Sequence, residues 1–153
     1  MKPICLHMKA FGSYLHDTTL DFTALGEQPL FLITGATGGG KTTILDAMCF
    51  ALYCRATGGR RSWAGMRSLG APQEDETLVE FIFSYQNVQY KWFRSRQDYF
   101  SKRADTVKTK EVHECYRMGT GGDWELLYAG SEARVREQAE QLLGHGILPP
   151  GGC

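Results

Sequence analysis

The sequence predicts an α/β domain with a mixed central sheet, an apolar helix and an antiparallel β-rich subdomain. An unbroken apolar run at 30–33 and a long helix pattern at 41–56 flank a glycine-rich segment, the order expected for strand, turn and helix. Apolar residues alternate between 79 and 92, which is typical of antiparallel strands. With 153 residues, 42% hydrophobic and 22% charged, the composition is that of one ordinary globular domain.

Charge and cysteine usage narrow the class of protein. Seventeen Lys and Arg balance seventeen Asp and Glu, which argues against holding nucleic acid by bulk electrostatics. The five cysteines form no C-x-x-C pair, so they predict reduced thiols rather than disulfides or a zinc site. No apolar run approaches the roughly 18 residues that a membrane span needs. We therefore expect a cytoplasmic protein with no membrane contact.

The first third of the chain predicts two short strands, one buried strand and one core helix. Residues 4–8 and 20–22 alternate, which indicates two short strands joined by a turn around Gly12 and Ser13. The continuous run at 30–33 fits a parallel strand covered on both faces. The helix from Lys41 is apolar almost all round, which indicates a core position, and it should stop near Gly58 and Gly59.

The rest of the chain predicts two hairpins and a final helix. Strands at 79–85 and 88–92 should turn at Asn87, and strands at 111–118 and 124–128 should be joined by the glycine-rich 119–123. Ser131 is placed to cap a helix that runs to Gly144. We therefore expect one lobe over residues 1–144. Residues 145–153 form an atypical Pro/Gly tail that predicts neither helix nor central strand and suggests a truncation.

One motif predicts chemistry. The segment 35–42 fits G-x-x-x-x-G-K-[ST], between a predicted strand and a predicted helix. Glycines let successive N–H groups turn toward phosphate oxygens, and the helix start adds its positive dipole end. The predicted nucleotide-binding residues are Gly35, Ala36, Thr37, Gly38, Gly39, Gly40, Lys41, Thr42 and Thr43.

The polar residues of this motif have separate predicted roles. The Lys41 ammonium is a point charge that suits the β- and γ-phosphates of ATP. The Thr42 hydroxyl is a hard oxygen ligand for Mg²⁺, and Thr43 can donate a further hydrogen bond to phosphate. ATP and Mg²⁺ are therefore the expected cofactors. Asp46, a charge on a largely apolar helix, is expected to make a structural hydrogen bond.

The stretch from Phe31 to Tyr53 closely resembles the N-terminal ATP-binding segment of the SbcC family, the ATPase subunits of the bacterial SbcCD nuclease and relatives of the SMC ATPases. Segments at 2–3, 10–12 and 21–26 extend the match upstream, and 66–68 and 124–127 look similar. The resemblance implies an ABC-type ATPase head of the P-loop NTPase fold, which clamps ATP between two heads. It also implies double-stranded DNA binding and regulation of an SbcD-like, Mn²⁺-dependent nuclease in DNA repair. Composition and spacing alone indicate only a P-loop nucleotide binder.

Departures from the family pattern limit what is expected of the chain by itself. Ala36 and Gly39 replace the usual Pro and Ala without removing phosphate-facing amides, whereas Pro150 stands where the family has a glutamine. No apolar strand after Lys41 ends in the Asp-Glu pair that would complete a metal site. We therefore assign no catalytic residue within this chain and expect an N-terminal fragment that binds ATP without hydrolysing it alone. The alternatives are a small P-loop nucleotide kinase or nucleotidase, and a non-catalytic DNA-interaction module.

Basic residues are concentrated in one candidate DNA-binding hairpin. Between 91 and 110 there are seven Lys and Arg residues and only two acidic residues, Asp98 and Asp105. Four aromatic residues are interleaved with the basic ones, a mixture that suits contact with a nucleic-acid backbone. The basic residues are Lys91, Arg94, Arg96, Lys102, Arg103, Lys108 and Lys110. An ordinary solvated hairpin is an equal interpretation. A second basic stretch, Arg55, Arg60, Arg61 and Arg67, is consistent with DNA or nucleotide contact and equally with a basic loop.

Overall fold

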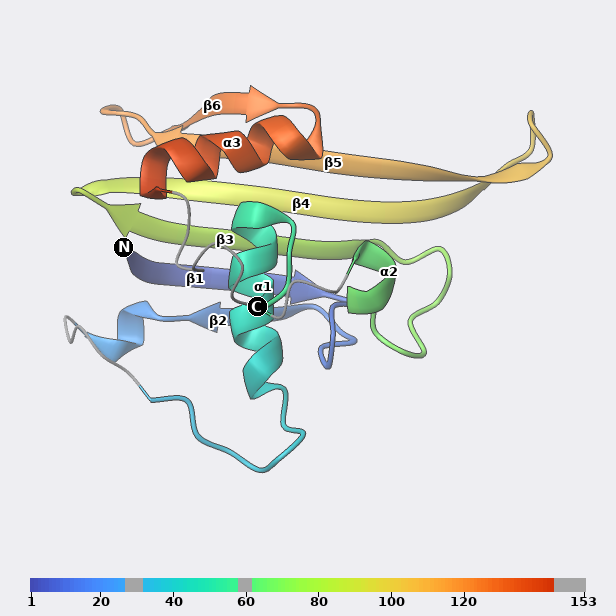
Figure 1. Ribbon diagram of the computed structural model, residues 1–153, viewed down its shortest axis with the longest axis horizontal. Helices are drawn as coiled ribbons and strands as arrows, with labels where there is room; N and C mark the ends of the chain where they lie inside the picture. Colours follow the sequence, from blue (N-terminus) through green and yellow to red (C-terminus); the bar gives the residue numbers. More distant parts are fainter. Residues whose placement is uncertain (27–31, 58–61, 145–153) are drawn as a thin grey trace.

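The structure is a computed structural model that describes residues 1–26, 32–57 and 62–144 (Figure 1). Its sheet has six strands in the order β2-β1-β3-β4-β5-β6. The strands are β1 (Lys2–Lys9), β2 (Thr18–Asp21), β3 (Thr77–Tyr85), β4 (Val88–Ser101), β5 (Thr106–Met118) and β6 (Trp124–Ala129). Each pair of neighbours is antiparallel.

The helices are gathered on one face of this sheet (Figure 1). They are α1 (Lys41–Tyr53), the short α2 (Trp63–Met66) and α3 (Glu132–Leu143), while the 3-10 turn η1 (Thr23–Leu25) follows the edge strand β2. Trp92 on β4 donates its indole N–H to the Val135 carbonyl of α3 at 3.2 Å. Within the described ranges, no helix combines the length and apolarity needed to cross a bilayer.

Several predicted elements are confirmed. The β3–β4 hairpin turns at Gln86 and Asn87, whose φ angles of +50° and +64° suit the two-residue turns that match strand twist. The β5–β6 hairpin lies where the glycine-rich loop predicted it. Ser131 caps α3 by accepting the Arg134 N–H at 3.4 Å, and Gly144 follows its last turn.

The predicted mixed sheet is wrong for the described residues, where every strand pairing is antiparallel. Residues 30 and 31 of the predicted parallel strand lie outside those ranges, and residues 32 and 33 are not strand. Leu32 is 85% exposed. An apolar run becomes a buried strand only when other strands flank it, and the six-stranded order β2-β1-β3-β4-β5-β6 includes no strand at residues 32 and 33.

Helix boundaries also differ from those expected. Helix α1 ends at Tyr53 because Cys54 takes a left-handed conformation, φ +54°, and donates its N–H to the Phe50 carbonyl at 2.8 Å. Gly58 and Gly59, the expected stop, lie outside the described residues. The four-residue α2 was not predicted, because one turn shows no periodicity.

The core lies between the sheet and α1, and the core position predicted for α1 is confirmed. Alternate β3 residues Val79, Phe81 and Phe83 are buried on the helix-bearing face. Phe50 of α1 packs edge-on against Trp63 of α2, with ring centroids 4.8 Å apart. Helix α1 is therefore fixed by tertiary packing along most of its length.

Strands β4 and β5 extend beyond their neighbours. The β3–β4 ladder ends at the pair Thr77↔Arg96, while β4 and β5 stay paired to Ser101↔Thr106. Residues 97–110 therefore form a two-stranded ribbon that projects from the body of the molecule (Figure 1). We call this segment the ribbon.

Candidate nucleotide-binding site

The glycine-rich loop has the backbone conformation that its glycines allow. Gly38 and Gly40 take φ angles of +82° and +81°, in the left-handed region that other residues rarely adopt. Gly39 donates its N–H to the Ala36 carbonyl at 3.1 Å, and a Cβ on Gly39 would lie 3.0 Å from that oxygen. The loop therefore closes tightly in front of α1.

The amino end of α1 has no side chain that caps its first amides. Gly40 is its N-cap, no side chain accepts a cap hydrogen bond, and the first turn holds no acidic residue. The first amides of a helix have no partner within the helix and carry its positive dipole end. Such an end is suited to bind an anion such as phosphate.

The polar residues of the motif take different positions. Lys41 Nζ donates to the carbonyls of Gly35 and Ala36, both at 2.6 Å, and it has no carboxylate partner among the described residues. Thr42 is exposed beside the loop. Thr43 is only 8% exposed, and its hydroxyl lies 3.3 Å from the Ser13 hydroxyl. The structure thus leaves Lys41 and Thr42 accessible and directs Thr43 toward the β1–β2 turn.

That turn forms a second wall, which sequence reasoning did not assign to the site. A Cβ on Gly12 would lie 2.4 Å from Thr43 Cγ2, so the turn contacts the first turn of α1 at van der Waals limits. A Cβ on Gly40 would lie 3.2 Å from the ring of Tyr14. Ser68 steadies the turn by donating to the Gly12 carbonyl at 2.9 Å. The signal in the sequence that could have pointed here is the glycine at position 12 of the predicted turn, which takes φ +55° in the structure.

Asp46, near the middle of α1, has the structural role expected from the sequence. The carboxylate is 3% exposed and accepts the Thr57 N–H at 2.8 Å, together with the Thr57 hydroxyl. It therefore ties the helix to the segment that follows it.

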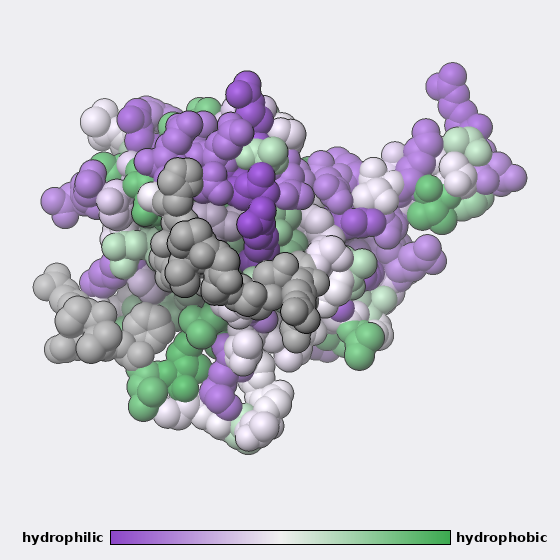
Figure 2. Space-filling view, in the orientation of Figure 1, coloured by the Kyte–Doolittle hydropathy of each residue, from purple (hydrophilic) through white to green (hydrophobic). Residues whose placement is uncertain are grey.

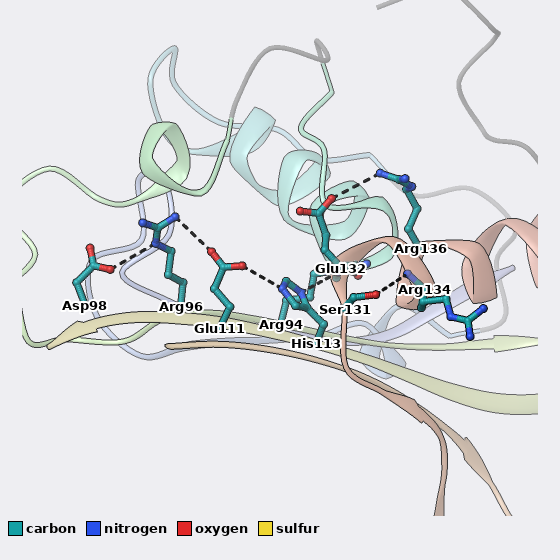
Figure 3. Close-up of polar contacts among 10 residues, drawn as sticks. Arg94, Arg96, Asp98, Glu111, His113, Ser131, Glu132, Arg134 and Arg136 are labelled. Carbon is teal, nitrogen blue, oxygen red and sulfur yellow. Dashed lines mark hydrogen bonds and ion pairs between the residues drawn. The ribbon is translucent and has the colours of Figure 1, made fainter. Parts of the chain in front are cut away.

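The carboxyl end of α1 is held by Arg94, which corrects its predicted place in a DNA-binding surface. Arg94 is 0% exposed, and it donates through Nε to the Ala51 carbonyl at 2.7 Å and through Nη2 to the Leu52 carbonyl at 2.9 Å. Its Nη1 lies 2.9 Å from His113 Nδ1 (Figure 3). Arg94 was predicted to be exposed because alternation alone cannot say which face of a lone hairpin a helix will cover.

Burial lowers the pKa of Arg94 and the pKa of His113. Desolvation by burial lowers the pKa of the Arg94 guanidinium from its ordinary value. Desolvation, and after it the charge of Arg94, lowers the pKa of His113 from 6.5. The Glu111 carboxylate, 3.3 Å from His113 Nε2, opposes the second shift.

The remaining basic residues of 91–110 divide into two groups. Lys91 lies over the rings of Tyr116 and Trp124, at 4.5 and 4.9 Å, and Arg96 pairs with Asp98 at 3.6 Å and Glu111 at 3.3 Å. The other four are exposed on the ribbon, and no ion pair holds them in the described structure: Lys102, Arg103, Lys108 and Lys110. The ribbon end is correspondingly hydrophilic, with a few apolar side chains (Figure 2).

The second basic stretch is not a cluster of accessible cations in the described structure. Arg67 donates to the carbonyls of Pro72 and Asp75 and to the Thr77 hydroxyl, which closes the loop before β3. Arg60 and Arg61 lie outside the described residues, and Arg55 is exposed.

Comparison with known proteins places this chain in a family. A family model described as an AAA domain matches residues 5–132, which include the loop, α1 and nearly all of the sheet. The chain belongs to the AAA domain family. Among curated proteins it resembles the SbcC subunit of nuclease SbcCD from Vibrio cholerae, with 37% identity over 144 residues. The corresponding protein of Lactococcus lactis is 43% identical over 109 residues, and that of Staphylococcus aureus is 36% identical over 158. The resemblance to the SbcC family is therefore confirmed.

The coverage is uneven between the chain and these relatives. The matches include 94%, 71% and 99% of this chain but only 14%, 10% and 15% of the relatives. Nearly the whole of this chain matches the proteins from Vibrio cholerae and Staphylococcus aureus, yet it spans only about a seventh of the length of each. It is in this segment that the P-loop motif and the AAA domain match coincide.

Proposed function

We propose that this chain is the nucleotide-binding lobe of an SbcC-type, ABC-like ATPase and that it binds ATP with Mg²⁺ at residues 35–43. The observation that carries the proposal is the uncapped amino end of α1 behind a loop of left-handed glycines, with Lys41 beside it and no carboxylate paired to that lysine among the described residues. Every one of these groups is a donor or a positive dipole, which favours a polyphosphate.

The described residues fit such a cofactor. The loop amides and the Lys41 ammonium would hold phosphate oxygens, and the exposed Thr42 hydroxyl would hold Mg²⁺. The metal would neutralise phosphate charge and orient the terminal phosphoryl group. The relatives are named as subunits of a nuclease. By that similarity, we propose that hydrolysis belongs to an assembly with a second ATPase head and an SbcD-like nuclease in DNA break processing, since no apolar strand after Lys41 ends in an Asp-Glu pair.

The ATP proposal is tested by thermal unfolding. Mg-ATP at a hundred times its dissociation constant should stabilise the fold by about 2.7 kcal/mol and raise the melting midpoint by roughly 5–10 °C. The variant Lys41→Ala should lose the shift, and Lys108→Ala, an exposed lysine on the ribbon, should keep it. No shift in the wild-type protein, or an equal shift in Lys41→Ala, would overturn the proposal.

We further propose that one face of the ribbon contacts the DNA backbone. In the β4–β5 register Tyr99 pairs with Lys108 and Gln97 with Lys110, so these four residues share the face opposite Arg96 and Glu111. Tyr99 is 45% exposed, so its ring is available for stacking beside the two lysines. Lys102 and Arg103 lie at the ribbon's end. Of the seven basic residues considered for DNA contact from the sequence, the proposal therefore keeps four: Lys102, Arg103, Lys108 and Lys110.

The DNA proposal is tested by the salt dependence of binding to duplex DNA. Each phosphate contact contributes a slope of about −0.9 in log affinity against log salt. Replacing Lys108 and Lys110 with Gln should make the slope shallower by nearly two such contacts. The matched control Arg96→Gln, on the opposite face and already ion-paired, should leave it unchanged. An unchanged slope in the double variant would remove this face from the interface.

A further inference from the structure

The carboxyl end of α1 is held by a residue of the sheet instead of by the helix's own sequence. The last turn of α1 contains no basic residue. Arg94 of β4 instead donates to the carbonyls of Ala51 and Leu52. These are among the last four carbonyls of the helix, which lack intrahelical partners, and a cation at this end is favoured by the helix dipole.

His113 provides a third acceptor for the guanidinium. A guanidinium carries only donors, so His113 Nδ1 must accept from Arg94 Nη1, and the ring is neutral with its hydrogen on Nε2. That Nε2 faces Glu111, which in turn pairs with Arg96 (Figure 3). Three hydrogen bonds, one from each nitrogen of the guanidinium, thus hold Arg94 and leave the group little freedom to turn.

Helix α1 can transmit this constraint along its length. It has 13 residues with no proline or glycine, so it spans about 20 Å as one rigid element. Its carboxyl end meets Arg94, and its amino end supplies the amides behind the glycine loop. A displacement of about 1 Å in such a binding constellation weakens it measurably.

We propose that Arg94 is a positioning residue for nucleotide binding, which acts by fixing the carboxyl end of α1 so that the amides at the amino end meet the phosphates. This inference rests on the proposed ATP site. It predicts that Arg94 variants lose nucleotide affinity in the folded protein, in addition to any loss of stability.

The test is isothermal titration with Mg²⁺ and a non-hydrolysable ATP analogue, at a temperature where circular dichroism shows each variant folded. Arg94→Met should weaken binding roughly tenfold, within the range known for residues that modulate a distant site. Arg94→Lys keeps the charge but not the planar fork, so it should restore part of the affinity, to about threefold below wild type.

Trp92→Phe is the matched control. Trp92 lies two residues away on the same strand and face, is fully buried, and donates to α3 instead of α1. Its loss should lower stability while nucleotide affinity changes less than about twofold. Wild-type affinity in Arg94→Lys and Arg94→Met, or an equal loss in Trp92→Phe, would show that Arg94 is only a core residue and would overturn the proposal. If Arg94→Met does not fold, the nucleotide affinities of Arg94→Lys and Trp92→Phe are compared instead, and a loss confined to Arg94→Lys supports the proposal.

Failure of the ATP site itself is distinguishable from failure of this inference. If the wild-type protein binds no nucleotide, amide hydrogen exchange still reports on positioning. Without ligand, Arg94→Lys should exchange faster than Trp92→Phe at residues 44–48 of α1. Equal exchange there would overturn the role of Arg94 independently of any nucleotide.

Discussion

The two ends of α1 differ in almost every physical respect. The amino end begins at a left-handed glycine, is exposed at Thr42, and has no capping side chain. The carboxyl end is buried, closes on Cys54 in a left-handed conformation, and its carbonyls accept hydrogen bonds from Arg94. One end presents donors that the helix leaves without partners, while the other has its acceptors satisfied by the protein.

This difference gives one helix an end that a ligand can reach and an end that is anchored in the core. Unpartnered amides that face water cost little, and a ligand can claim them. Unpartnered carbonyls in the core would cost much more, so the protein supplies a cation from the sheet. Substitutions at the carboxyl end should therefore destabilise the fold, whereas those at the amino end should change ligand binding with little effect on the free protein.

The strongest test of this contrast is Arg94→Met. It leaves two buried carbonyls and His113 without a donor, so the free energy of unfolding should fall by about 3–5 kcal/mol. Urea denaturation followed by tryptophan fluorescence measures the change. A loss below about 1 kcal/mol would mean that water replaces the guanidinium and that the carboxyl end is not an anchor.

Lys41→Ala should give the opposite result at the amino end. Its hydrogen bonds to Gly35 and Ala36 are exposed, so the free energy of unfolding without nucleotide should change by less than about 0.5 kcal/mol. The nucleotide-dependent increment of about 2.7 kcal/mol should disappear. Denaturation with and without Mg-ATP separates the two quantities. A large loss of basal stability would contradict the contrast between the ends.

Asp46→Ala probes the middle of the helix on its buried side. Removing the carboxylate leaves the Thr57 N–H and hydroxyl without their acceptor, so unfolding should require about 2 kcal/mol less. Nucleotide affinity in the folded protein should be retained. Thr57→Ala, which loses only the hydroxyl bond, is the milder control and should cost about 1 kcal/mol.

Acid should weaken the carboxyl end through His113. Its pKa is lowered in the folded protein, mainly by burial and then by Arg94, so the unfolded chain takes up the proton first. The stability that this residue contributes is complete above its unfolded pKa of 6.5 and declines as pH falls from there toward the lower folded pKa. Among the charged neighbours of His113, Arg94 lowers its pKa, whereas Glu111 and Glu132 raise it. His113→Gln should flatten this part of the stability–pH curve, and an unchanged curve would assign the titration elsewhere.

Local patterns predicted most elements of the fold. The Gln86–Asn87 turn, the Ser131 cap and the alternation along β3 depend on neighbouring residues, and each was confirmed. The predicted strand at 30–33 was not confirmed at residues 32 and 33, the part of it that the structure describes, because a continuous apolar run becomes a buried strand only if other strands flank it. The stop of α1 was misplaced, because Cys54 takes a conformation that the sequence assigns more readily to glycine.

The candidate site, like the fold, was only partly predictable from the sequence. The motif at 35–42 could be predicted because its chemistry depends on a short, local backbone path. Arg94, Tyr14 and Gly12 could not be connected to α1 or its N-cap, because their contacts join residues 26 to 43 positions apart in the chain.

The sequence by itself determined the glycine loop, the lysine and the apolar helix that follows them, since these are local properties of a few consecutive residues. Only the tertiary structure decided which basic residues serve the fold and which face solvent. Arg94 and Lys108 look alike in the sequence, yet one lies under α1 and the other on the projecting ribbon. The packing of α1 on one face of the sheet makes that distinction, because a helix covers some positions of a hairpin and leaves the others in water.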